Sequence, residues 1–185
     1  MIIASKKRKE NIAEYLLYMW QIEDMIRADG LDIDKIRTNI IDRFDGLTSE
    51  QRMEMEDWYD SLIDMMRREG VTERGHLQIN RNILAELTDL HKQLLADVRF
   101  NRYQELYYKV LPYIVELRAK AGNAAEDELT TCFTALYGML MLKLQGKEIS
   151  EDTSRAIAEI TSLIATLSAY YHKNETEPIF MPSDL

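Results

Sequence analysis

Apolar side chains recur along the chain at spacings of three and four residues, the period of an amphipathic α-helix. Glycines interrupt this pattern at wide intervals, and no segment alternates apolar and polar residues as a strand would. The sequence therefore predicts an all-α fold, a single-domain helical bundle over residues 1–185. We expect seven helices, at roughly 5–28, 33–44, 49–69, 77–99, 102–121, 125–145 and 151–173.

Three local signals refine this outline. The second helix, 33–44, is short and carries a narrow apolar stripe, so we expect it to lie across one end of the bundle. Pro112 removes a backbone donor inside the fifth helix, which predicts a kink or a break near Val110. The tail, 173–185, holds apolar residues between two prolines, so we expect it to run extended and dock on its own chain or on a neighbouring subunit.

Charge and cysteine content narrow the function classes. The formal net charge of −9 argues against a nucleic-acid partner, because such binding depends on Lys and Arg neutralising phosphates. The basic side chains of Lys6–Lys9 are then expected to lie in solvent at the start of the first helix. No signal-peptide pattern and no membrane-spanning apolar stretch is found, and the lone Cys132 lies among apolar residues. We expect a cytoplasmic protein that binds no membrane.

One carboxylate, that of Glu23, falls on the apolar face of the first helix, in line with Leu16 and Met19. A charge at such a position requires a partner or a role. Arg27 lies four residues further on, in the orientation that favours an ion pair, so a Glu23–Arg27 pair at the edge of the core is the expected structural explanation. Trp20 flanks the same stripe.

A second polar residue, His91, interrupts the apolar face of the fourth helix between Leu87 and Leu94. A core histidine is more often a hydrogen-bonded structural group than a ligand or a base. The alternative is that Glu23 and His91 face each other across the bundle and form a pH-sensitive latch or a ligand contact. The candidate polar or ligand contacts are therefore Glu23, Arg27, His91 and Trp20.

The sequence holds no recognisable catalytic, cofactor-binding or metal-binding set. The di-iron pattern of bundles needs Glu-x-x-His on two helices, and this chain has that spacing only at Glu73 and His76, where Gly75 indicates a loop. Neither a calcium loop nor a glycine-rich nucleotide turn is present. We expect no metal and no cofactor, and an enzyme is the least favoured class.

Two surface patterns bear on partners. The last helix pairs a broad apolar face with a stripe of small residues that would pack on the sixth helix or, if exposed, across a twofold axis. Packing within the chain is slightly favoured. Tyrosines cluster around the fifth helix and would suit either a core boundary or an aromatic-lined cavity. The stripe comprises Ala158, Ser162, Ala165 and Ala169, and the cluster comprises Tyr103, Tyr107, Tyr108 and Tyr113.

The opening helix, Asn11–Asp24 (Asn-Ile-Ala-Glu-Tyr-Leu-Leu-Tyr-Met-Trp-Gln-Ile-Glu-Asp), resembles a family of all-helical proteins from Bacteroides-like bacteria that is described as a domain of unknown function. The resemblance extends over nearly the whole chain. It implies a compact cytoplasmic helical domain, and it supplies no catalytic residues.

The first functional hypothesis is a non-catalytic helical interaction or assembly protein that associates with itself, as a homodimer or larger homo-oligomer, or with a protein partner. The alternative is a small-ligand sensor with an aromatic cavity near the fifth helix and Glu23 or His91 as its polar contact.

Overall fold

The computed structural model describes residues 2–122 and 127–180, and it is an all-α single domain. Of the described residues 82% are helical, in eight α-helices, and none forms a strand. The predicted fold class is confirmed, with one helix more than expected. The helices are α1 (Ile2–Glu10), α2 (Ile12–Ala28), α3 (Ile33–Asn39), α4 (Ser49–Glu69), α5 (Gln78–Ala96), α6 (Asn101–Ala121), α7 (Glu128–Leu144) and α8 (Glu151–Thr176), with 3-10 turns η1 (Ile41–Arg43) and η2 (Val98–Phe100).

The additional helix arises at Asn11, where the single helix expected over 5–28 divides into α1 and α2. Asn11 has an extended backbone, with φ −157°, and its side-chain oxygen accepts from the amides of Ala13 and Glu14. An asparagine that caps the first turn in this way starts a new helix. Ser168 and His172 of α8 complete the cap, since Ser168 donates to the Asn11 oxygen and His172 Nε2 accepts from the amide of Ile12.

Other boundaries differ from the sequence prediction at helix ends. The segment expected as 33–44 ends as a helix at Asn39 and continues as η1, and the one expected to reach 99 ends at Ala96 before η2. Helix α8 runs to Thr176, so the first residues assigned to an extended tail are helical. Pro112 lies inside α6, which stays one helix, so of the two expected outcomes, a kink or a break near Val110, the break is wrong. The expected start of α7 at 125 lies outside the described residues.

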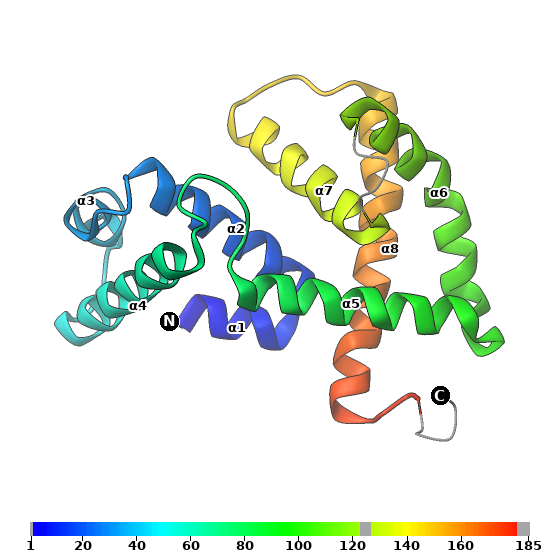
Figure 1. The fold of residues 1–185 in the computed structure, drawn as a ribbon, viewed down its shortest axis with the longest axis horizontal. Helices are drawn as coiled ribbons and strands as arrows, with labels where there is room; N and C mark the ends of the chain where they lie inside the picture. Colours follow the sequence, from blue (N-terminus) through cyan, green and yellow to red (C-terminus); the bar gives the residue numbers. More distant parts are fainter. Residues whose placement is uncertain (1, 123–126, 181–185) are drawn as a thin grey trace.

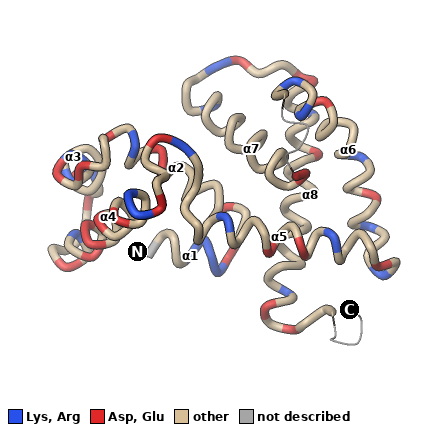
Figure 2. The backbone as a smooth tube through the Cα atoms, in the orientation of Figure 1, with Lys and Arg blue, Asp and Glu red and all other residues tan. Residues whose placement is uncertain are grey.

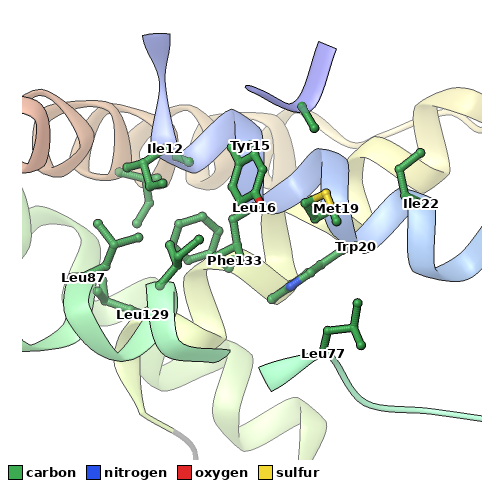
Figure 3. Packing of buried hydrophobic residues seen from close by; sticks show 14 of the residues in the cluster. Ile12, Tyr15, Leu16, Met19, Trp20, Ile22, Leu77, Leu87, Leu129 and Phe133 are labelled. Atoms are coloured by element: carbon green, nitrogen blue, oxygen red, sulfur yellow. The ribbon is translucent and has the colours of Figure 1, made fainter. Parts of the chain in front are cut away.

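Helix α5 connects the two ends of the molecule (Figure 1). One of its ends lies beside α2 and the connection from α4, and the other leads into α6, which packs with α7 and α8. Helices α3 and α4 form the opposite end, so the short α3 lies at one end of the bundle, as predicted. Helix α2 supplies the centre of the core, where Ile12, Leu16 and Met19 meet Phe133 and Leu129 of α7 (Figure 3).

The tail docks on its own chain as far as the structure describes it. Phe180 lies against Phe100 of η2, with ring centroids 5.5 Å apart, and the amide of Ile179 donates to the side chain of Asn174. The expectation that this segment packs on the chain's own surface is met for these residues, while 181–185 lie outside the described part.

None of the described helices combines the length and the apolar character needed to cross a bilayer.

Candidate functional site

The carboxylate of Glu23 is fully buried and accepts hydrogen bonds from two groups of the connection between α4 and α5 and from one in the first turn of α5. Its Oε1 accepts from the amide of Leu77 at 2.9 Å and from Nδ2 of Asn80 at 2.7 Å. Its Oε2 lies 2.6 Å from Nδ1 of His76. A buried carboxylate is tolerated when hydrogen bonds replace its lost hydration, and these three do so.

His76 covers this carboxylate and stacks on Trp20. The imidazole and indole centroids are 4.1 Å apart and the two rings are inclined by only 11°. Because a carboxylate oxygen can only accept, Nδ1 of His76 carries the hydrogen and donates it to Glu23. The His76 side chain is 34% exposed whereas that of Glu23 is 0% exposed, so the imidazole forms the outer wall of the site.

Arg27 does not pair with Glu23, so the predicted ion pair is wrong. Its guanidinium reaches across to the same connection, where Nη2 donates to the carbonyl of Val71 at 3.1 Å and to that of Gly75. Its Nη1 forms an ion pair with Asp24 at 2.7 Å. Backbone carbonyls in a turn have no helical partner, and the planar fork of an arginine satisfies two of them together.

Helix α7 joins the site through Tyr137. Its hydroxyl donates to Asp24 Oδ2 at 2.6 Å, and its ring meets Trp20 edge-on with centroids 5.7 Å apart. Phe133 also meets Trp20 at an angle of 61°, and Figure 3 shows the indole lying between Phe133 and Leu77. The site therefore ties α2, α7 and the start of α5 together.

Two polar atoms in this site have no hydrogen-bond partner among the described residues. They are Nε1 of Trp20 and Oδ1 of Asn80, in side chains only 3% and 1% exposed. Asn80 turns its amide nitrogen to Glu23, which leaves the oxygen without a donor. Such unpaired buried atoms are rare in folded proteins, and they occur at places where water or a ligand binds.

His91 lies in a different place, so the predicted Glu23–His91 contact is wrong. Asn80, which binds Glu23, is eleven residues before His91 in α5, and this separates them by roughly 16 Å at 1.5 Å per residue. Nδ1 of His91 bonds to the hydroxyl of Tyr103 at 2.6 Å, and Nε2 lies 3.5 Å from Glu128 without a directed hydrogen bond. Burial lowers the pKa of His91 below its usual range, and the nearby Glu128 opposes that shift only in part.

The tyrosines around α6 do not line one aromatic cavity. Tyr103 is fully buried, whereas Tyr108 is 66% exposed. Clefts of about 360 and 510 Å³ lie between α6 and α8, and of the four clustered tyrosines only Tyr113 lines either of them. Burial raises the pKa of Tyr107 to about 12, with its hydrogen bond to Glu128 acting in the same direction.

Burial also raises the pKa of Cys132 to about 12, so this thiol is an inert core group.

The described residues contain no group of His, Cys, Asp or Glu side chains arranged to hold a metal ion.

The stripe of small residues on α8 faces solvent. Ala158, Ser162, Ala165 and Ala169 are all exposed, so the slightly favoured packing against α7 is wrong. Two of them, Ser162 and Ala169, line the larger cleft beside α6. The stripe is therefore available to another molecule.

Sequence reasoning found Glu23 and Trp20 but missed the role of His76. The glycine before His76 correctly indicated a loop, and the residue was set aside for that reason. The signal that the sequence offers is the apolar Leu77 directly after His76 at the expected start of the helix, since an apolar residue there turns toward the core and brings its neighbour close to it.

The fold and the site together define an all-helical protein whose central buried carboxylate fastens one interhelical connection. The chain belongs to the family described as Domain of unknown function (DUF4924), whose model matches residues 1–178. This confirms the predicted membership of a family without an assigned function. No curated protein and no solved structure matches the chain.

Proposed function

We propose that the protein is a non-catalytic helical assembly protein that forms a homodimer in the bacterial cytoplasm. The observation that carries this proposal is the surface of α7. No residue between Glu128 and Lys143 is charged, and Figure 2 shows α7 without charged residues along its middle. A helix that is apolar on every side is normally buried on every side.

The rest of the chain covers only part of α7. Leu136, Leu140 and Met141 remain half-buried, and Leu144 is 63% exposed. These four residues, which we call the α7 apolar face, follow one another at helical spacing and lie on one side of the helix. An apolar face left open in this way is typical of an interaction site.

A second copy of the chain suits this face because the face is neutral. The molecule carries a formal net charge of −9, so two copies repel each other over most surfaces. A pairing through the α7 apolar face brings together a surface with no acidic side chain, since α7 has none after Glu128, and a twofold axis lets the same face serve both copies. The exposed small residues of α8 allow a close approach at a second contact. The bacterial and cytoplasmic assignments rest on the resemblance carried by Asn11–Asp24.

Size-exclusion chromatography with light scattering, at micromolar concentration, tests the proposal. We expect a dimer for the native protein and a monomer for Leu144→Glu, because the new charge enters the neutral face. Tyr108→Glu on the outer side of α6, a residue 66% exposed, is the matched control and should remain dimeric. A monomeric native protein, or dissociation by Tyr108→Glu with Leu144→Glu unaffected, contradicts the proposed interface.

A further inference from the structure

The contacts of His76 are those that a small aromatic ligand would make. Its imidazole stacks flat on Trp20 and its ring N–H donates to a carboxylate, that of Glu23. Stacking on an indole together with a hydrogen bond to a buried carboxylate is a general means of holding a flat nitrogen heterocycle. The imidazole is also the outermost part of the site, at 34% exposure, whereas everything beneath it is buried.

The backbone beneath the ring does not depend on the ring. The carbonyls of Val71 and Gly75 are held by Arg27, and the amide of Leu77 is held by the other oxygen of Glu23. Rotation of the His76 side chain about χ1 therefore moves the imidazole into solvent while the connection stays in place. Such rotations of partly exposed side chains are fast, on the order of nanoseconds or less.

The buried oxygen of Asn80 is the observation that points to a ligand and not to a permanent plug. Its amide nitrogen binds Glu23, so Oδ1 belongs to the same amide group that holds the carboxylate, and this oxygen has no donor among the described residues. His76 has a single N–H on that side and uses it for Glu23. A heterocycle with two adjacent N–H groups would satisfy both Glu23 and Asn80.

We propose that Trp20, Glu23 and Asn80 form a binding slot for a flat nitrogen heterocycle with ring N–H donors, and that His76 occupies the slot until such a ligand displaces it. A guanine base fits both acceptors, because its ring N1–H and its exocyclic amino group lie side by side, whereas an imidazole supplies only the first donor. The indole supplies the stacking surface, Glu23 Oε2 accepts the first N–H and Asn80 Oδ1 accepts a second.

A matched pair of probes tests the slot. The chain has two tryptophans, so Trp58→Phe leaves Trp20 as the sole indole. In this background we expect benzimidazole, which supplies only the N–H for Glu23, to quench Trp20 fluorescence and to shift the NMR signal of its Nε1–H. Guanosine, which supplies a second donor for Asn80, should do the same at a lower concentration. The control is 1-methylbenzimidazole, which keeps the flat ring but has lost the N–H donor and should bind more weakly by at least roughly tenfold.

Removal of the His76 side chain shows whether this side chain competes with a ligand for the slot or only fills a space in the fold. If His76 fills the slot for more than nine-tenths of the time, His76→Ala raises the apparent affinity for benzimidazole by at least about tenfold, because the competitor is gone. Glu23→Gln should abolish the preference for benzimidazole over 1-methylbenzimidazole. The proposal is overturned if the protein with His76 and Glu23 intact shows no quenching of Trp20 fluorescence at millimolar benzimidazole. It is also overturned if benzimidazole and 1-methylbenzimidazole bind equally. Because the titration of the protein with His76 intact decides this alone, the outcome does not depend on whether the variants fold.

Discussion

Glu23 and His76 are 53 residues apart in sequence, yet their side chains are joined across 2.6 Å. The bond is one of several that hold the connection between α4 and α5 against the middle of α2. Asn80 and Leu77 bind the same carboxylate, so one buried side chain orders the last loop residues and the first turn of α5 together. Arg27 fastens the earlier half of the loop from the same helix.

Arg27→Lys should loosen this connection without unfolding the protein. A lysine has one ammonium group and cannot reach two carbonyls with a planar fork, so we expect a loss of roughly 1–2 kcal/mol in the free energy of unfolding. Arg74, which is exposed in the loop, provides a trypsin site next to Gly75. Limited proteolysis should cut there faster in the variant. Arg37→Lys, in the α3–α4 contact with Glu56, is the control and should leave cleavage at Arg74 unchanged.

His91 should make the protein less stable in acid. Its pKa is lowered in the folded state by burial, so between the folded value and about 6.5 the unfolded chain binds a proton that the folded protein does not. The stability that His91 contributes is therefore present above about pH 6.5 and is lost as the pH falls through the folded pKa. Tyr103 and Tyr107 of α6, Asp127 and Glu128 of α7, and Lys92 of α5 face or surround the ring.

Urea unfolding of the native protein and of His91→Gln at several pH values between 5 and 8 measures this effect. The native protein should show the steeper decline toward acid, by up to one proton, or about 1.4 kcal/mol per pH unit. Equal slopes for the two proteins would show that His91 does not titrate differently in the folded and unfolded states.

Cys132 should be unreactive while the protein is folded. Burial raises its pKa to about 12, so at pH 8 almost no thiolate forms, and the side chain is 0% exposed. We expect a thiol reagent such as Ellman's reagent to react only at the rate of unfolding, and at once in denaturing urea. Rapid labelling of the native protein would contradict the described packing around α7.

The helical period predicted the fold because most of the core follows one rule. Isoleucine, leucine and methionine at spacings of three and four residues bury one face of each helix, and nothing else in the chain competes with this. The helix boundaries were harder to predict because single side chains determine where a helix begins or ends. Asn11 caps α2 with its own side chain and so ends α1, although no glycine or proline marks this division in the sequence.

The partners of Glu23 were only partly predictable for a related reason. The sequence shows that a carboxylate lies on an apolar face. Helical spacing, however, relates only residues of the same helix, and this favoured Arg27 as the partner of Glu23. The true partners come from a loop whose path depends on the packing of α4 and α5. Arg27 instead binds the loop carbonyls of Val71 and Gly75, which have no helical donors.

A double-mutant cycle on the free energy of unfolding tests the central assignment most directly, namely that Glu23 is coupled to His76 and not to Arg27. We expect Glu23→Gln and His76→Ala to show a coupling energy of about 1–2 kcal/mol, and Glu23→Gln and Arg27→Met to couple by less than about 0.5 kcal/mol. The reverse order, with strong coupling to Arg27 and none to His76, would contradict the account of this site.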